Sequence, residues 1–358
     1  MKYRSAVILP LESLGTSGTK TIDLNIADPI SALRFEGIYT NGSSGTQLVP
    51  VPDVISKVEF VDGSDVLFSL DGSQLAAVHF YEGQPLIFVD GSAIDSDTIN
   101  FNLQYDFGRF LRDPLLAFLP NQFRNPQLKV TWNVATPNAA GSALSLEITA
   151  EMFDEKAISP IGFLKTAQFH SYAPAASTYE YIDLPTDLII RKLYLQTKYY
   201  GKAATTLLTS AKLSEDNDKR VPFDLTDTNW CNLVAEKWGM CLQNVWGYGG
   251  SAADCIFLAP CKYETGVFNN CSGAREVVIQ GSTGGKWSLT SSTAGDTIHG
   301  LVMGFLPYFL YCYPFGADGD IEDWYDASRV GSLRFRVQSG SESSGATNNT
   351  ILQQLRKY

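Results

Sequence analysis

Histidine and positive charge are scarce in this chain of 358 residues, and each shortage argues against a class of protein. The three histidines, His79, His170 and His299, lie far apart, so no two have the spacing of an H-x-H or H-E-x-x-H metal site. This argues against a two-domain cupin. Lys and Arg number 27 against 38 Asp and Glu, a net charge of −11, whereas a protein that coats nucleic acid needs the opposite balance.

Long apolar segments are also missing. The N-terminal apolar run, Ala6 to Leu9, is shorter than the core of a secretory signal, so we expect no signal peptide. The longest apolar stretch, Leu301 to Phe315, contains Pro307 and Pro314 and cannot form a membrane-spanning helix. With 44% hydrophobic and 18% charged residues, the chain should nevertheless fold into compact domains.

Cysteine is absent from the first half of the chain. The six cysteines follow residue 230 without a C-x-x-C pair and without a histidine at zinc spacing. We expect reduced, packed thiols, with disulfides as the alternative if the protein meets an oxidising medium. The cysteines are Cys231, Cys241, Cys255, Cys261, Cys271 and Cys312.

Catalytic and cofactor-binding motifs are not found. The chain has neither a G-x-S-x-G elbow nor a P-loop, and its glycine clusters at 247–250 and 284–285 indicate loops. The acidic run at 318–326 lacks EF-hand spacing and predicts a solvated loop. It leaves open whether Asp318, Asp320, Glu322 and Asp323 bind calcium. We therefore expect a protein that is not an enzyme, with no catalytic, cofactor-binding or metal-binding residues and no cofactor.

Strand and turn signals dominate what the chain does contain. It has 30 Gly, 16 Pro, 20 Phe, 17 Tyr and 6 Trp, a composition that favours an all-β protein. Alternation in Val58–Leu70 predicts a hairpin that turns at Asp62-Gly63. Only two helices stand out, one over 72–81 after a possible N-cap at Asp71 and one over 228–238 entered from Asp227.

An internal repeat organises these strands. Four segments of the first half have counterparts in the same order in the second half, each hairpin leading into a short helix. Chance alternation is the alternative for any single match, but the preserved order favours tandem domains of one topology. The matched segments are Ile22–Leu24 with Ile182–Leu184, Leu33–Glu36 with Leu193–Gln196, Val66–Leu70 with Val221–Leu225, and Leu128–Trp132 with Leu333–Val337.

The repeat places two domains in the chain. We predict a first domain at 15–158, a linker at 159–177 rich in Pro, Ala and Ser, and a second domain at 178–358. The second domain carries an insertion at about 231–300, which contains most of the cysteines. Domains of about 140 to 180 residues with many short strands favour eight-stranded jelly rolls over immunoglobulin sandwiches. The predicted fold class is all-β, with two tandem jelly rolls, short helices and a long loop insertion in the second.

The chain resembles the double jelly-roll major capsid proteins of tailless icosahedral viruses that contain an internal membrane. The residues that carry the resemblance are the openings of the two domains, Thr21–Phe35 and Tyr181–Leu195, the polar hairpin Ser214–Asp218 with Val221–Asp224, and the closing strand Asn349–Tyr358. This family is defined by architecture and strand pattern, without an invariant catalytic motif.

The resemblance implies a structural role. It implies a viral coat protein that self-assembles as pseudo-hexameric homotrimers into an icosahedral capsid, located in the virion after assembly in the host cell. Its implied partners are further copies of itself, neighbouring capsomers, and penton and minor capsid proteins, without direct contact to nucleic acid. Lipid of an inner membrane is a further candidate, facing basic chain ends at Lys2, Arg4, Arg356 and Lys357. The alternative is a secreted tandem jelly-roll glycoamidase or carbohydrate-binding protein.

Overall fold

The first half of the chain folds into two facing four-stranded antiparallel sheets. The computed structural model describes residues 2–42, 49–86, 91–93, 96–135, 141, 143–154, 158–249, 254–270, 277–291 and 296–358. One sheet has the order β1-β9-β3-β7, and the other has the order β2-β8-β4-β5. The strands are β1 (Tyr3–Ser13), β2 (Ser17–Asp23), β3 (Ile30–Thr40), β4 (Ile55–Asp62), β5 (Asp65–Leu70), β7 (Thr98–Asp106), β8 (Pro126–Asn133) and β9 (Ala143–Phe153).

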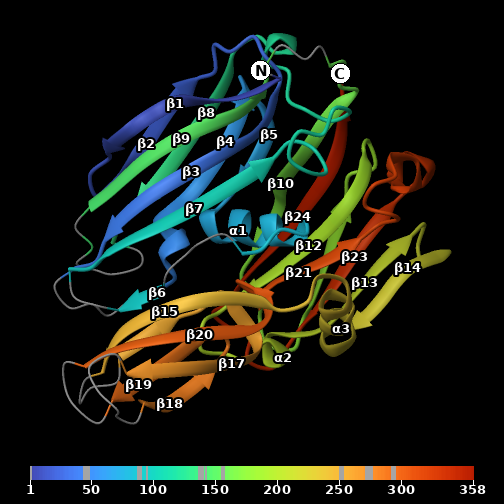
Figure 1. The fold of residues 1–358 in the computed structure, drawn as a ribbon. Helices are drawn as coiled ribbons and strands as arrows, with labels where there is room; N and C mark the ends of the chain where they lie inside the picture. The colour runs from blue at the N-terminus through green and yellow to red at the C-terminus, as the bar shows by residue number, and fades with distance from the viewer. Residues whose placement is uncertain are drawn as a thin grey trace.

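The second half repeats this topology, as Figure 1 shows. Its two sheets have the orders β10-β24-β12-β21 and β11-β23-β13-β14, so each strand has a counterpart in the first half. The predicted tandem jelly rolls are confirmed, and the matched hairpins are β4–β5 and β13–β14. The strands are β10 (Gly162–Tyr172), β11 (Tyr179–Leu184), β12 (Ile189–Lys198), β13 (Leu208–Glu215), β14 (Arg220–Thr226), β21 (Leu310–Pro314), β23 (Leu333–Ser339) and β24 (Thr347–Lys357), with a short β22 (Tyr325–Asp326) beside β12.

The two rolls are joined along one sheet, which the sequence analysis did not anticipate. Strand β5 of the first roll pairs in parallel with β10 of the second through Ser69 and Ala167. This contact links one sheet of each roll into a single nine-stranded sheet. Each roll keeps its own second sheet, so the jelly-roll topology of both halves is unchanged.

Two strands lie where the sequence analysis placed none, and the predicted boundaries were wrong there. Strand β1 precedes the predicted domain start at residue 15, and β10 occupies most of the predicted linker at 159–177. Strand β1 is an edge strand with register shifts around Pro10, a position where proline is tolerated because no ladder bond is lost. The first half of β10 is buried on both faces, including Phe163 and Thr166, so its sequence does not alternate.

Two helices follow matching hairpins, as predicted. Helix α1 (Gly72–Tyr81) begins with a capping box, in which Asp71 Oδ1 accepts from Gln74 N at 2.7 Å and Gln74 Oε1 accepts from Asp71 N at 3.1 Å. Helix α3 (Asp227–Trp238) is instead capped by the Thr226 hydroxyl. The remaining short helices are η1 (Val51–Val54), η2 (Pro120–Gln122), α2 (Ala204–Leu207), η3 (Ile321–Asp323) and η4 (Ala327–Arg329).

The insertion of the second roll forms strands of its own between β14 and β21. Its first predicted residues belong to α3, and its strands continue past residue 300 to Pro307. They form the small sheets β17-β20-β15-β6 and β16-β19-β18 around a separate core that includes Trp287 and Val302. The strands are β15 (Cys241–Gly249), β16 (Asp254–Phe257), β17 (Pro260–Asn270), β18 (Val277–Thr283), β19 (Lys286–Ser291) and β20 (Asp296–Pro307).

The insertion also contacts the first roll. Strand β6 (Gly91–Ala93), which lies between α1 and β7, pairs in parallel with β15. In Figure 1 the insertion lies at the end of the molecule opposite the two chain termini. The apolar stretch Leu301–Phe315 supplies the end of β20 and all of β21, and within the described ranges no helix is long and apolar enough to cross a bilayer.

Candidate functional site: a buried charge network between the two jelly rolls

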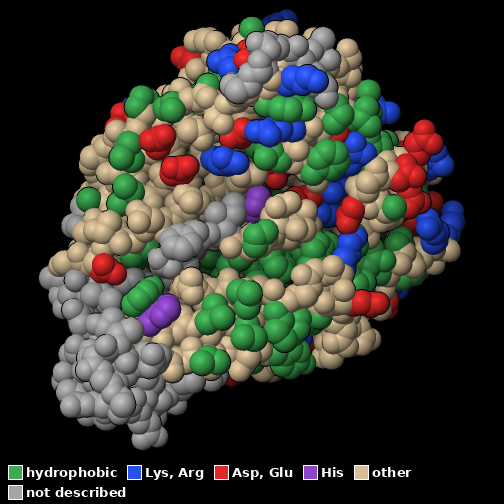
Figure 2. Space-filling view, viewed as in Figure 1, with side chains coloured by type: hydrophobic (Ala, Val, Ile, Leu, Met, Phe, Trp, Pro, Cys, Tyr) green, Lys and Arg blue, Asp and Glu red, His purple; other side chains and the backbone are tan. Residues whose placement is uncertain are grey.

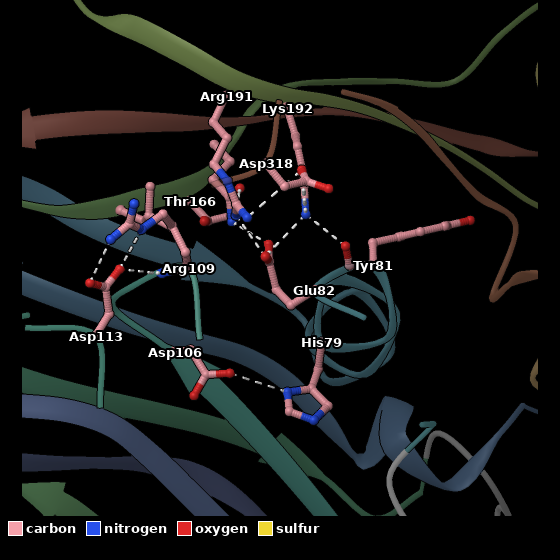
Figure 3. A network of polar contacts seen from close by, with 12 residues as sticks. His79, Tyr81, Glu82, Asp106, Arg109, Asp113, Thr166, Arg191, Lys192 and Asp318 are labelled. Carbon is pink, nitrogen blue, oxygen red and sulfur yellow. Dashed lines mark hydrogen bonds and ion pairs between the residues drawn. The ribbon is translucent and has the colours of Figure 1, made fainter. Parts of the chain in front are cut away.

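Helix α1 lies between the two jelly rolls and leads into the charge network of Figure 3. All ten of its residues are buried. The helix contacts β7 of the first roll and β20 and β21 of the second half. A helix buried on every side needs apolar residues around its circumference, and Leu75, Ala76, Val78 and Phe80 supply them.

Glu82, the residue after α1, is the anion at the centre of the network. Its carboxylate accepts hydrogen bonds from Arg191 Nη1 at 2.6 Å and Gln353 Nε2 at 2.9 Å, and Lys192 Nζ lies 3.0 Å away. Lys192 also donates to the carbonyl oxygen of Tyr81 at 2.6 Å. The partial negative charge at the C-terminal end of a helix favours a cation there. The network therefore joins α1 to strands β12 and β24 of the second roll.

The three charged side chains are almost completely buried, with exposures of 5% for Glu82, 3% for Arg191 and 1% for Lys192. Burial raises the pKa of Glu82, but Arg191 and Lys192 outweigh it, so this pKa lies below its ordinary value. Burial lowers the pKa of Lys192, and Glu82 offsets only part of this effect. The pKa of Arg191 lies above its ordinary value because the attraction of Glu82 exceeds the effect of burial. Glu82 is therefore ionised in the folded protein at neutral pH.

Further polar contacts cross the same seam. Lys198 Nζ of β12 donates to Asp53 Oδ1 at 2.7 Å and to Ser73 Oγ at 3.2 Å. Gln74 Nε2 donates to Gln196 Oε1 at 3.0 Å. A buried polar group left without a partner costs about 1–3 kcal/mol, so these pairs favour one docking arrangement of the two rolls.

Glu82, Arg191 and Lys192 were not among the candidate residues predicted from the sequence. The available signal was the adjacent pair Arg191 and Lys192 between the apolar residues Ile189–Ile190 and Leu193–Leu195 of one strand. The closing strand adds the amides Asn348, Asn349 and Gln353. Charged residues in a buried strand require partners. Their partner Glu82 could not be identified, because it follows a helix in the other half of the chain.

The acidic run does not bring its four candidate residues together around one point. Asp318 Oδ2 lies 2.8 Å from Lys237 Nζ, Asp320 Oδ1 accepts from the Glu322 backbone N–H, and Asp323 Oδ2 accepts from the Ala317 backbone N–H. In the part of the chain that the structure describes, no three His, Cys, Asp or Glu side chains form a group that could hold a metal ion. The carboxylates of this loop thus bond to separate donors within the protein.

The three histidines have separate surroundings. His170 Nε2 lies 3.3 Å from Glu180 Oε1, and the ring of His299 stacks on Trp246 at 4.0 Å. His79, on α1, is buried with its Nδ1 3.6 Å from Asp106 Oδ2 of β7, as Figure 3 shows. Burial lowers the pKa of His79 to about 4 and raises the pKa of Asp106 to about 6.

The cysteines that the structure describes are free thiols. Cys231, Cys241, Cys261 and Cys312 are buried, and burial raises the pKa of each. Cys255 is partly buried. Buried thiols with raised pKa values act as small apolar side chains and are poor nucleophiles. Cys271 lies outside the described residues.

Comparisons with known proteins show the fold. No family model and no curated protein matches the chain. The chain resembles double jelly-roll major capsid proteins. The STIV MCP matches at a TM-score of 0.61 and 12% identity, covering 99% of this chain and 97% of that chain. The PBCV-1 virus capsid protein matches at 0.55 and 11% (99% and 93% covered), and the major capsid protein of bacteriophage PM2 at 0.54 and 11% (99% and 98% covered).

Replacing Glu82 by Gln should lower the free energy of unfolding. Arg191 and Lys192 would stay buried, and the next carboxylate, Asp318, is 3.9 Å from each. Removing one partner of a buried ion pair typically costs about 3–5 kcal/mol. Urea denaturation at pH 7 measures the loss. As a control, Glu342→Gln removes a carboxylate from an exposed pair with Lys202 and should leave stability unchanged; equal effects of the two variants would contradict the role of Glu82.

Replacing Asp106 by Asn should flatten the dependence of stability on pH. The pKa of Asp106 rises from 3.8 to about 6 on folding, so the folded protein holds this proton more tightly than the unfolded chain. Its stabilising contribution is complete below pH 3.8 and is lost as the pH rises through about 6. The variant should therefore lose less stability between pH 4 and pH 7, by on the order of 3 kcal/mol. Denaturation curves across this range test it, and a slope equal to that of the wild type would contradict it.

Proposed function

We propose that this chain is the major capsid protein of a virion, and that it self-assembles as homotrimers into an icosahedral shell. The observation that carries the proposal is the match of both jelly rolls, over 99% of the chain, to capsid proteins whose TM-scores exceed 0.5. Two similar rolls in one chain give six rolls around a threefold axis. Such a block is nearly hexagonal and can tile a shell, and cyclic symmetry closes the trimer without open-ended growth.

An uncharged apolar face on the insertion supports self-association. Leu242, Leu301 and Val267 lie on adjacent strands, and their side chains are 52%, 39% and 72% exposed. Leu301 is the register partner of Val267 and of Asn244, two positions from Leu242, so the three share one face of the sheet. Figure 2 shows hydrophobic side chains gathered over β15, β17 and β20. In a chain of net charge −11, an uncharged apolar face is where identical copies can approach without repulsion.

The two ends of the molecule differ, which suits a subunit of a shell. The termini lie at one end and the insertion at the other. We place the insertion outward and the termini toward the interior of the virion. Neighbouring capsomers and penton and minor capsid proteins are the proposed protein partners. The proposed assembly takes place in the host cell.

Fewer of the basic residues at the chain ends are available to bind lipid than the sequence indicated. Arg4 lies 2.6 Å from Asp28, and Arg356 lies 2.5 Å from Asp65, so two of the four cations are neutralised within the protein. Lys2 is exposed and remains, with Lys357, available to anionic headgroups, each contributing on the order of 1 kcal/mol at a surface.

The glycoamidase alternative is not favoured. The structures that match with TM-scores above 0.5 are capsid proteins. A structural role is therefore the better supported proposal, and a role as an enzyme is not part of it.

Light scattering should find a trimer. Three chains of 39.3 kDa give a mass of about 118 kDa. Changing both Val267 and Leu301 to Asp should shift the population toward monomers, because both side chains would place charge in the apolar face. Val221→Asp, the same kind of change at an exposed valine of β14, should leave the trimer intact. A stable monomer of the wild type at all concentrations would contradict the capsid function itself.

Neutralising Lys2 and Lys357 together should reduce binding to anionic vesicles, because both side chains are exposed at the chain ends and can contact lipid headgroups. Co-sedimentation with vesicles that contain phosphatidylglycerol measures the binding. Neutralising Arg4 and Arg356, which are already paired, should have the smaller effect. Binding that is the same in the wild type and both variants would remove lipid from the proposed partners.

A further inference from the structure

A pocket of about 250 Å³ opens onto the charge network between the two rolls. Four cationic side chains line it, and they come from distant parts of the chain. Arg109 follows β7 of the first roll, Arg191 and Lys192 belong to β12, and Lys237 lies in the last turn of α3. The pocket is thus built by both rolls, in a protein whose overall charge is strongly negative.

Two carboxylates also line the pocket, and they have different roles. Glu82 lies at its base and is bonded to Arg191, Lys192 and Gln353. Asp318 is 39% exposed, on a loop that contains Gly316 and Gly319. A Cβ added at Gly319 would meet nothing within 4 Å, whereas one added at Gly316 would clash with the Asp323 carbonyl oxygen. The cations that line the pocket outnumber these carboxylates.

Asp318 leaves N–H donors of Arg191 and Lys192 without a hydrogen bond from their side of the pocket. Arg191 Nη2 and Lys192 Nζ lie 3.9 Å from Asp318 Oδ1, beyond hydrogen-bond distance. Arg191 Nε is buried and has no hydrogen-bond partner among the residues that the structure describes. Only Lys237 Nζ is close to this carboxylate, at 2.8 Å. Figure 3 shows Arg191 and Lys192 on either side of Glu82 and Asp318. Because their distances to Asp318 exceed hydrogen-bond length, the two buried cations retain donors that a ligand can use.

One aromatic side chain, Trp238, lies beside two of these cations. Lys192 Nζ lies 5.8 Å and Lys237 Nζ 5.0 Å from the centre of the Trp238 ring. Arg109 forms a two-pronged ion pair with Asp113 and donates to the Gly319 carbonyl at 2.6 Å. This last bond ties the loop of Asp318 to the first roll. The cations are thus positioned before any ligand enters.

We propose that this pocket binds a small oxyanion, a phosphate or the carboxylate of an organic acid, between Lys237 and the free donors of Arg191 and Lys192. The bound anion would occupy the place beside these cations where the Asp318 carboxylate now lies, so Asp318 competes with it. A bound oxyanion would bridge charged groups of both rolls and so stabilise their docking. Charge-assisted hydrogen bonds from several converging cations are the usual basis of oxyanion recognition in proteins.

Titration calorimetry with inorganic phosphate tests the site on the full chain at constant ionic strength. Lys237→Gln should weaken phosphate binding about tenfold, the effect of losing one charge-assisted hydrogen bond. Asp318→Asn should strengthen it about tenfold, because the competing charge is removed. Lys202→Gln, which changes an exposed lysine paired with Glu342 outside the pocket, is the matched control and should bind phosphate as the wild type does.

Two outcomes of the calorimetry would contradict the proposed oxyanion site. Equal phosphate binding by the Lys237 and Lys202 variants, or no phosphate binding by the wild type, would overturn the proposal. If Asp318→Asn fails to fold, the Lys237 and Lys202 variants still test the site. Both lysines are partly exposed, so we expect both variants to fold. Co-sedimentation with phosphatidic acid vesicles identifies the source of the oxyanion: a loss for Lys237→Gln but not for Lys202→Gln assigns a lipid headgroup, and equal binding by both assigns a free anion.

Discussion

The pairing of Glu82 with Arg191 and Lys192 is the constraint on which the arrangement of the two rolls depends. Strand β12 lies within the core of the second roll, where a cation is tolerated only with a partner. The first roll supplies that partner at the end of α1. Backbone pairing also joins the halves, through Ser69 with Ala167 and through Leu116 with Gly162. The side-chain charge and amide contacts add specific partners to this backbone pairing, because a buried donor without its acceptor is costly.

The two helices at matching positions show how the repeated halves have diverged. Helix α1 is buried over its whole length between the rolls, and it connects them. Helix α3 buries four residues, among them Trp230, whose Nε1 donates to the Cys312 carbonyl at 2.8 Å. Asp227 at its start pairs with Lys262 of the insertion. The helix at this topological position therefore connects the two rolls in the first half, where it is α1. In the second half, where it is α3, it connects the roll to the insertion.

The polar seam favours a single docking of the rolls, because any other arrangement leaves buried donors without acceptors. The insertion has its own small core around Trp287, and β15 also pairs with β6 of the first half of the chain. Leu242, Val267 and Leu301 are exposed on one face of its larger sheet. A single docking of the rolls and these exposed apolar side chains are what the proposed self-association requires.

Local patterns in the sequence determined much of the fold. Alternation located the hairpins of both halves, an acidic N-cap at Asp71 placed the start of α1, and the order of matched strands identified two jelly rolls. These features depend on residues within a few positions of one another, so a single sequence contains them. Two strands were not predicted from the sequence. The edge strand β1 has a proline and register shifts, and the first half of β10 is buried on both faces, so neither alternates regularly.

Only the tertiary structure decided the charge network and the pocket above it. Glu82 and Arg191 are separated by 109 positions, and Asp318 follows much later in the chain. In the sequence, Asp318 belongs to an acidic run that resembles a solvated loop or a cation site. In the folded protein it faces Lys192 and Lys237, because α1, β12 and α3 converge there. Electrostatic partners are set by distance in space, and a one-dimensional pattern contains no information about it.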